Sequence, residues 1–367
     1  MNSKISLNKE RRIIFLSILG LSLFGILMVY EASSIYAYKN FQDSLYFFKR
    51  QIFFFIISLF AFFAILAVDP IFLKRYAFLI LLFNIFLLFL VLIVGKKVGG
   101  AKRWLSFFGF NFQPSEFLKI SFLLWFSQFV AKRNLVLNTL PDLIIPSTMI
   151  GIISLLLLLE PDLGSIIFWF LWLTICLFLF KAKKRHLFFL IFIGIIAIFF
   201  LIKLYPSRLK RLIYFLNPWK DPKGFGYQLI QSQIAFGSGG FFGVGLGESK
   251  QKFLFLPAAH TDFIFSIIAE EFGFLGSVFL LGIYFFLFYN FFKIGLVVSG
   301  FSKVFSLGMS VLFGLEVIIN IGVSCGLLPT KGLPLPFISY GGSNLFIHYL
   351  LVGLVFRFSK DAQSASC

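Results

Sequence analysis

Apolar stretches of membrane-spanning length recur along the whole chain and are separated by short polar segments. A helix needs about 20 apolar residues to cross the hydrocarbon core of a bilayer. Ten stretches approach or exceed that length, at 13–33, 51–68, 76–95, 115–131, 143–159, 163–180, 187–204, 262–292, 303–326 and 343–357. The pattern predicts an all-α polytopic membrane protein with one ten-helix domain over residues 13–357 and short tails at 1–12 and 358–367.

Two of the ten stretches differ from a plain apolar helix. The fourth is the weakest because it carries Glu116 and Lys119, and the eighth is overlong and is expected to bend near Gly273 and Gly276. The first stretch follows several basic residues, as the apolar part of a signal peptide would. Its length and the nine stretches after it favour an uncleaved anchor.

The composition supports a membrane protein and excludes several other classes. Of the 367 residues, 59% are hydrophobic and 13% charged, whereas a soluble domain carries about 25% charged residues. This excludes a soluble enzyme, a disordered chain and a nucleic-acid-binding domain. The net charge of +18 arises mostly between the apolar stretches, where basic residues contact lipid headgroups and set the topology, with a smaller share left for an anionic substrate.

The basic residues also predict an orientation. If the N-terminus is cytoplasmic, Lys and Arg are roughly twice as dense in the cytoplasmic segments as in the short outer loops. Both termini are then cytoplasmic, and the long loop 205–260 between the seventh and eighth helices is extracytoplasmic. That loop adds basic residues to the outer side and weakens the asymmetry. Because no ATP is available outside, a substrate used there must arrive already activated.

Several carboxylates lie in or beside the apolar stretches, where an ionised group costs about 2.5–3.5 kcal/mol or more. Glu116 and Lys119 face the same side of a helix, either as a buried ion pair or as the lining of a polar cavity in which Lys119 meets a phosphate. Asp262 either caps a helix, as Thr261 also could, or serves as a carboxylate whose protonation is tuned by burial. Glu270 and Glu271 are expected to pair with other helices.

Two further segments are rich in Gly or Pro. Residues 237–247 hold many glycines but do not match G-x-G-x-x-G, so nucleotide binding is rejected, and the glycines instead permit a close backbone approach, for example to a lipid or sugar. Residues 328–343 contain three prolines and predict an ordered outer or re-entrant loop that lines a polar cavity. The cysteines and histidines form neither a disulfide framework nor a metal-ligand pattern.

These motifs, in this order, resemble the SEDS family of shape, elongation, division and sporulation proteins. The matching segments are Gly100-Ala101-Lys102-Arg103-Trp104, Gln113-Pro114-Ser115-Glu116 with Lys119, Glu160-Pro161-Asp162-Leu163-Gly164, Asn217-Pro218-Trp219 with Asp221-Pro222, Gly226-Tyr227-Gln228 with Gln231-Ser232, Gly237-Ser238-Gly239-Gly240, His260-Thr261-Asp262-Phe263 and the region from Asn320 to Ser343. The tetrad Pro329-Thr330-Lys331-Gly332 resembles the division branch of the family more than the elongation branch.

The resemblance implies a ten-helix bundle with cytoplasmic termini and a peptidoglycan glycosyltransferase activity. Such an enzyme polymerises lipid II, an undecaprenyl-pyrophosphate-linked disaccharide peptide, at the outer face of the cytoplasmic membrane, with inversion at the sugar. The implied partners are a class B penicillin-binding protein, which is a transpeptidase, and other proteins of the division machinery. The implied location is the division septum.

The family's essential carboxylate matches Asp262, which the resemblance implies is catalytic. The implied substrate-binding residues are Arg103, Glu116, Lys119, Gln228, Gln231, Ser232, Lys252, His260, Thr261, Lys331, Ser339 and Tyr340. Asp262 would act on the attacking sugar hydroxyl as a general base or by holding a divalent cation, Mg²⁺ or Mn²⁺, while Lys119, Arg103 or the metal would stabilise the departing pyrophosphate. The metal's ligands cannot be identified from the sequence.

The chain departs from the family pattern at three positions. Ala258 stands where Glu is usual, Glu316 where Gln is common, and Asn344 where Ser is frequent. Three other functions fit the same residues: a flippase or transporter for lipid II, a non-catalytic scaffold of the division machinery, and an elongation-type polymerase. The absence of an inverted-repeat pattern and the one-sided, motif-rich loop count against a transporter.

Overall fold

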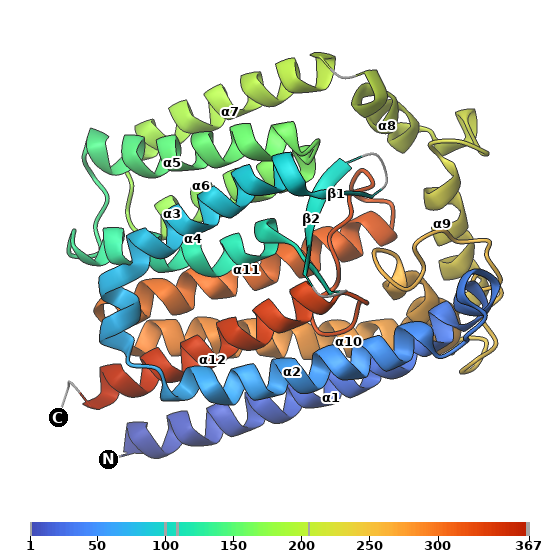
Figure 1. Cartoon of the computed structure of the whole chain (residues 1–367), viewed down its shortest axis with the longest axis horizontal. Coiled ribbons are helices and arrows are strands. Elements are labelled where there is room, and N and C mark those ends of the chain that lie inside the picture. The colour runs from blue at the N-terminus through green and yellow to red at the C-terminus, as the bar shows by residue number, and fades with distance from the viewer. Residues whose placement is uncertain (1, 99–100, 108–109, 205, 365–367) are drawn as a thin grey trace. The chain divides into compact units, whose positions relative to one another are not determined.

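The structure is a computed structural model that describes residues 2–98, 101–107, 110–204 and 206–364. Gly100 of the predicted Gly100–Trp104 motif and the end of the predicted C-terminal tail, 365–367, lie outside the described residues. The described chain is mostly helical (Figure 1). Its helices are α1 Asn2–Phe41, α2 Tyr46–Ala67, α3 Pro70–Val94, α4 Pro114–Ala131, α5 Leu140–Leu159, α6 Leu163–Leu179, α7 Lys184–Leu204, α8 Pro206–Leu216, α9 Tyr227–Gly239, α10 Ile264–Val297, α11 Gly300–Ser324 and α12 Gly342–Ser364.

Each of the ten apolar stretches coincides with one of these helices. Among the described residues, eight helices are long and apolar enough to cross a membrane. The other two that match a predicted stretch are α6, which is apolar but shorter, and α4, which carries the two predicted charges. The mostly helical polytopic architecture is therefore confirmed, while the number of spans and their orientation stay predictions.

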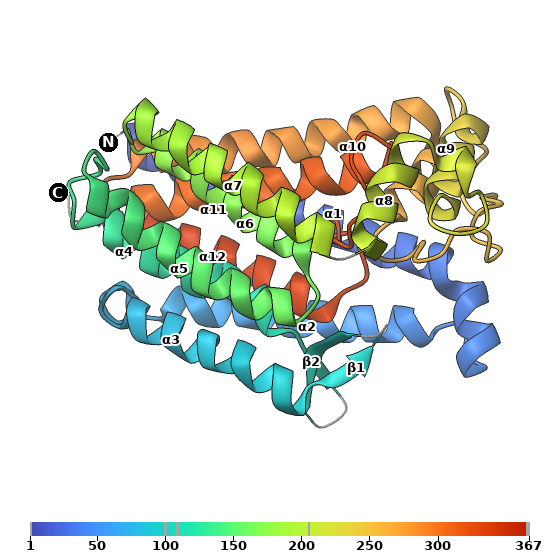
Figure 2. The same cartoon turned by 90° about the horizontal axis from the view of Figure 1, so that it is seen from above.

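The segment between α3 and α4 departs from the all-α prediction. It forms a three-stranded antiparallel sheet from β1 Lys96–Val98, β2 Ala101–Phe107 and β3 Phe110–Phe112, in the order β1-β2-β3. Figure 2 shows β1 and β2 at the end of α3. A connection that leaves one helix and returns to the next must pair its own backbone groups, and consecutive antiparallel strands do so locally.

The predicted long loop 205–260 is itself largely ordered in its described part. It contains α8, a single 3₁₀ turn at Pro218–Lys220, and α9. The glycine-rich segment follows α9, and the chain then runs through successive turns to α10.

Helix α10 is broken at Gly273, one of the two positions at which a bend is predicted. Gly273 has a φ of +65° and a ψ of −160°, which interrupts the helical hydrogen bonds on both sides of it. Residues 240–245 replace them with four backbone hydrogen bonds of 3.0–3.2 Å to residues 270–271 and 274–275. A Cβ on Gly243 would lie 2.1 Å from the Glu271 carbonyl oxygen. The glycines therefore permit a close approach to the chain's own broken helix.

The chain divides into two compact units, and each is described by itself. The first comprises Met1–Ile57, Phe199–Phe288 and Phe313–Leu345, and the second comprises Ser58–Ile198, Tyr289–Leu312 and Phe346–Cys367. Asp262 and the predicted substrate-binding residues numbered above 200 belong to the first unit. Arg103, Glu116 and Lys119 belong to the second.

Candidate functional site

The turn that precedes α10 is held by three hydrogen bonds to consecutive carbonyl groups. The carbonyls of the His260–Asp262 segment accept, in chain order, from the backbone N–H of Tyr340 at 2.9 Å, the hydroxyl of Ser339 at 2.6 Å and the side-chain amide of Asn320 at 2.9 Å. Backbone carbonyls outside a helix need such partners wherever water is scarce. The structure therefore brings together the predicted residues His260, Thr261, Asp262, Ser339 and Tyr340.

The donors come largely from the proline-containing segment 328–343, which is non-helical through Gly341 as predicted. The hydroxyl oxygen of Ser339 also accepts the Leu335 amide N–H at 2.8 Å, which folds this segment back on itself. The buried side chain of Gln51 donates to the Ser339 carbonyl at 3.3 Å. The segment is thus tied to α2 as well as to the turn before α10.

The carboxylate of Asp262 is partly buried and lies against Gly332. A Cβ on Gly332 would lie 2.9 Å from Asp262 Oδ2, so the glycine leaves room for the carboxylate oxygen. Burial raises the pKa of Asp262 to about 6. Its carboxylate accepts no hydrogen bond from the described residues, and α10 begins only at Ile264. Asp262 therefore does not cap the helix, and the alternative of a simple N-cap is wrong.

His260 lies among aromatic rings. Its ring centroid is 4.5 Å from that of Phe47, 5.6 Å from that of Tyr36 and 5.8 Å from that of Tyr340. Burial lowers the pKa of His260 to about 4, so the imidazole is neutral at pH 7. It can therefore donate one hydrogen bond and accept another, but it supplies no positive charge.

A cavity of about 540 Å³ lies between the last turns of α1 and the chain leading to Asp262. Its polar lining consists of side chains that donate hydrogen bonds, together with one exposed aromatic ring: Tyr36, Lys39, Asn40, Lys252, His260 and Thr261. Ala258, where the family pattern has Glu, also lines it and has a φ of +57°. This lining suits a sugar that carries anionic groups, because an aromatic ring offers an apolar face while the Lys39 ammonium and the Asn40 amide can bind anions.

Lys252 is bound within the protein. Its Nζ lies 3.0 Å from a carboxylate oxygen of Glu31 on α1 and 3.6 Å from one of Glu271 on α10, and it donates to the Gly247 carbonyl. Only 9% of the residue is exposed. These contacts link the glycine-rich segment to both helices, so the side chain's charge is already balanced by two carboxylates.

Glu270 is also satisfied inside the first unit. Its carboxylate accepts hydrogen bonds from the hydroxyls of Ser238 and Ser249 and from the backbone amides of Lys250 and Gln251. Glu270 and Glu271 are paired, but the prediction that they pair with other helices holds only for Ser238, on α9. The other partners lie in the non-helical segment 249–252.

The predicted residues on α9 differ in their exposure. Ser232 is buried, its hydroxyl lies 2.7 Å from the hydroxyl of Ser266, and it donates to the Ser324 carbonyl. Gln228 and Gln231 are partly exposed on the same helix. Ser232 therefore joins α9 to α10 and α11, while the two glutamines remain accessible.

In the second unit, the predicted pair on α4 forms a short ion pair. Lys119 Nζ lies 2.7 Å from Glu116 Oε2, and the two residues are 4% and 7% exposed. Arg103 on β2 donates from Nε to the Glu160 carbonyl at 2.9 Å and from Nη2 to the Pro161 carbonyl at 2.7 Å. Arg103 thereby fixes the turn between α5 and α6.

Glu160 lies in that turn. Among the described carboxyl groups outside the apolar helices, its carboxyl group is the only one with both oxygens buried and without a hydrogen-bond partner. It is 1% exposed, and neither carboxyl oxygen has a hydrogen-bond partner among the described residues. Burial raises its pKa to about 8, and Asp162 adds to the rise while Arg103 opposes it. Glu160 is therefore largely protonated at pH 7.

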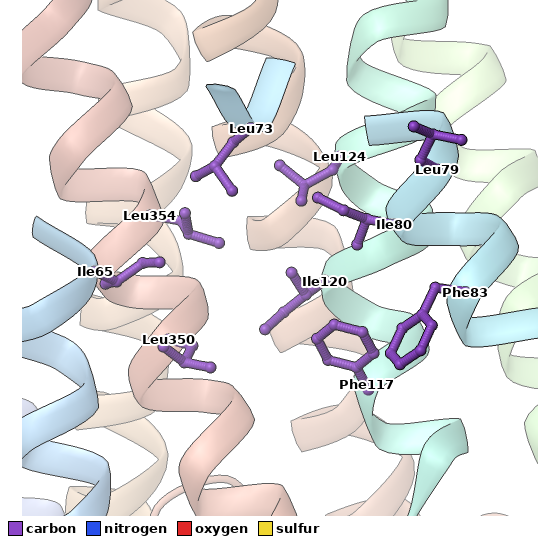
Figure 3. A pocket seen from close by; sticks show the side chains of 10 residues that line it. All are labelled: Ile65, Leu73, Leu79, Ile80, Phe83, Phe117, Ile120, Leu124, Leu350 and Leu354. Atoms are coloured by element: carbon purple, nitrogen blue, oxygen red, sulfur yellow. The ribbon is translucent and has the colours of Figure 1, made fainter. Parts of the chain in front are cut away.

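An apolar cavity of about 380 Å³ also lies in the second unit (Figure 3). Its walls are the side chains of α2, α3, α4 and α12: Ile65, Leu73, Leu79, Ile80, Phe83, Phe117, Ile120, Leu124, Leu350 and Leu354. Phe117 and Ile120 directly follow Glu116 and Lys119 on α4. A purely hydrocarbon lining of this kind suits an acyl or polyprenyl chain.

The sequence assigns no role to Asn320, Gln51 or Gly332, although Asn320 and Gly332 stand within the family motifs. A signal was present for Asn320 and Gln51, because each is a lone amide in an apolar stretch, and such residues usually have a specific partner. The role of Gly332 was harder to predict, because nothing in the sequence indicates which side chain lies against a glycine.

The described residues contain no group of three or more His, Cys, Asp or Glu side chains that would hold a metal ion. Asp262 alone therefore does not form an all-protein metal site. Mg²⁺ is nevertheless often held by one or two carboxylates together with substrate phosphates, and that mode fits a single carboxylate.

Comparison with known proteins identifies the family. A profile of the FtsW/RodA/SpoVE family, described as "Cell cycle protein", matches residues 11–364. The chain is 42% identical over 360 residues to "Probable peptidoglycan glycosyltransferase FtsW" of Trichlorobacter lovleyi, which covers 96% of this chain and 94% of the relative. It is 39% identical over 351 residues to the protein of the same name from Wigglesworthia glossinidia brevipalpis, covering 94% and 92%.

Solved structures agree. A chain in the structure described as "Structural coordination of polymerization and crosslinking by a peptidoglycan synthase complex" matches with a TM-score of 0.80 and 29% identity, covering 95% of this chain and 97% of that one. The rod shape determining protein RodA of Thermus thermophilus matches with a TM-score of 0.71 and 26% identity, covering 95% and 96%. The chain therefore shares the polytopic membrane-protein fold of these two structures. The chain belongs to the FtsW/RodA/SpoVE family, which confirms the resemblance in its motifs.

Proposed function

We propose that this protein is a peptidoglycan glycosyltransferase that polymerises lipid II into glycan strands for the septal wall. Family membership supports the activity, since relatives about 40% identical over nearly the whole chain carry that name. The observation that carries the mechanism is Asp262. It is a partly buried carboxylate with a pKa of about 6, and its backbone is held while its oxygens are left without hydrogen bonds from the described residues.

Asp262 acts as the general base. It takes the proton of the attacking sugar hydroxyl while that oxygen bonds to the anomeric carbon of the second sugar, and the bond from that carbon to the lipid pyrophosphate breaks with inversion. A pKa of about 6 keeps the group ionised at pH 7 and makes it a stronger base than an ordinary Asp. The pyrophosphate is a good leaving group, so no second carboxylate is required.

The substrate's other parts have chemically suited partners. The cavity of about 540 Å³, whose lining ends at Thr261, suits a sugar with anionic groups, and Lys331 directly precedes Gly332 in the chain. Arg103 and Lys119 are proposed partners of the pyrophosphate. A divalent cation would be held by Asp262 together with substrate phosphates, where it would neutralise phosphate charge.

The proposed topology has ten spans, cytoplasmic termini and an outer segment 205–260. The proposed partner is a class B penicillin-binding protein that crosslinks the new strands, together with other division proteins. Support comes from the related structure of a peptidoglycan synthase complex and from the Pro329–Gly332 tetrad.

A lipid II polymerisation assay on purified protein, with and without the partner, tests this function. Wild type is compared with Asp262→Asn and with Glu248→Gln, a matched control because Glu248 is an exposed carboxylate in the segment 205–260 that precedes Asp262. Glycan strands from wild type and the control, but not from Asp262→Asn, are expected. Transfer of labelled lipid between vesicle leaflets without polymer would instead indicate a flippase. Full complementation of depleted cells by Asp262→Asn would indicate a scaffold.

A further inference from the structure

The side chain of Asn320 contacts two backbone segments that surround the Asp262 carboxylate. Its Nδ2 donates to the carbonyl of Asp262 at 2.9 Å and to the carbonyl of Leu333 at 2.7 Å. Leu333 directly follows Gly332, the residue against which the carboxylate lies. A single amide group therefore fixes both the residue that carries the carboxylate and the segment that faces it.

Only the nitrogen of this amide is used. Asn320 is 1% exposed, and its Oδ1 has no hydrogen-bond partner among the described residues. A buried oxygen without a partner is unfavourable, so packing alone does not account for an amide at this position. The geometry instead requires two N–H donors on one side chain, which Asp, Leu and Ser cannot supply.

We infer that Asn320 is a positioning residue for the reaction: it holds the Asp262 carboxylate at the face of Gly332 by bridging the carbonyls of Asp262 and Leu333. The expected effect on the reaction rate rests on the proposed function, whereas the hydrogen bonds of Asn320 do not. Ser339 and Tyr340 hold the two preceding carbonyls. Of these three donors, Asn320 alone bonds to Asp262 itself, and it is also the only one of the three on a membrane helix, α11.

Removing the bridge should let the turn before α10 and the segment around Leu333 separate, so that water reaches the carboxylate. Because burial is what raises the pKa of Asp262, hydration lowers it toward the ordinary value of about 3.9. A displacement of about 1 Å at a reacting group costs roughly 10²-fold in rate. Loss of helix packing alone would lower the amount of folded protein and leave the titration of Asp262 unchanged.

The test compares wild type with Asn320→Leu, which keeps the branched shape but has no donor, and with Asn320→Gln, which keeps the donor on a longer arm. The matched control is Ser324→Ala, one turn away on α11, which removes a buried hydroxyl that donates to the Asn320 carbonyl at 3.0 Å. Two quantities are measured against pH in the purified, partner-bound protein. One is the rate of lipid II polymerisation. The other is carbodiimide modification of Asp262, followed by peptide mass spectrometry and measured with a chelator and without lipid II, so that no cation occupies the carboxylate.

We expect Asn320→Leu to lower kcat by roughly 10²-fold and to shift the midpoint of Asp262 modification downward by at least one pH unit. Asn320→Gln should recover part of both, and Ser324→Ala should change neither. Unchanged modification of Asp262 in Asn320→Leu, or an equal effect in the control, would overturn the inference. Should the leucine variant not fold, Asn320→Ser is measured with the same two outcomes. If wild type makes no polymer, the proposed function fails, while the modification midpoint still decides the role of Asn320.

Discussion

Two turns of the chain each hold a carboxyl group whose pKa is raised by burial. The two carboxyl groups differ in how accessible they are. In the turn before α10, donors from Asn320 and the segment 328–343 bind the backbone carbonyls, and the Asp262 carboxylate stays partly accessible beside Gly332. In the turn between α5 and α6, Arg103 binds the backbone carbonyls of Glu160 and Pro161, and the Glu160 carboxyl is sealed at 1% exposure.

In both turns the backbone carbonyls are hydrogen-bonded while the carboxyl group itself is not, yet the two carboxyl groups have different charge states at pH 7. Asp262, with a pKa of about 6, is mostly ionised, and Glu160, with a pKa of about 8, is mostly protonated. Desolvation of the charged form is the main cause of both shifts, and for Glu160 the nearby charge of Asp162 adds to the rise. A perturbed pKa alone is thus weak evidence of catalysis, and access for a substrate has to accompany it.

The largest expected contrast is in activity. Asp262→Asn should lower lipid II polymerisation by about 10³-fold, because general bases typically contribute 10²–10⁴-fold. Glu160→Gln should stay within about twofold of wild type, because its carboxyl is already neutral and has no access to substrate. Both variants are assayed with the partner present. Comparable losses of polymerisation activity in the two variants would show that the Glu160 carboxyl group also takes part in the reaction.

A smaller loss is expected from Gly332→Ala. The added Cβ would lie 2.9 Å from Asp262 Oδ2, closer than a methyl group and an oxygen normally approach, so the carboxylate has to move. Polymerisation should fall by more than about tenfold, with little change in thermal stability, because Gly332 is exposed. Gly237→Ala on α9 is the matched control, since a Cβ there meets nothing within 4 Å. Equal activity of the two variants would contradict the placement of Asp262.

Much of the helical architecture was predictable, because hydrophobic length is a local property of the sequence. Each apolar stretch became a helix, and the overlong α10 breaks at Gly273 as predicted. The three-stranded sheet was not predicted, because its strands are short and show no strong alternation. The motifs located Asp262 but not its surroundings. Asn320 and Gln51 bind carbonyls 58 and 288 residues away in the chain, and such partners are set by tertiary packing.

The pH dependence of the reaction distinguishes the two carboxyl groups further. Polymerisation should fall as the pH drops through about 6, because Asp262 becomes protonated there and a protonated base cannot accept the hydroxyl proton. At pH 5 the rate should be about tenfold below its plateau. Glu160→Gln should leave this limb in place. An acidic limb near 4 in wild type would show that Asp262 is hydrated like an ordinary carboxylate.

The smallest effect expected is on stability. Glu160 has a pKa of about 8 in the folded protein, against an ordinary value of 4.5 for a hydrated Glu, so the folded state binds more protons than the unfolded state between these values. Stability therefore falls as the pH rises from about 4.5 to about 8. The Glu160→Gln variant has no ionisable group at this position, so its stability should not fall with pH for this reason. Its melting temperature should exceed that of wild type by a margin that grows from pH 5 to pH 8.5. The exposed control Glu248→Gln should show no such trend, and a constant margin for Glu160→Gln would mean that its carboxyl is ionised or hydrated in the folded protein.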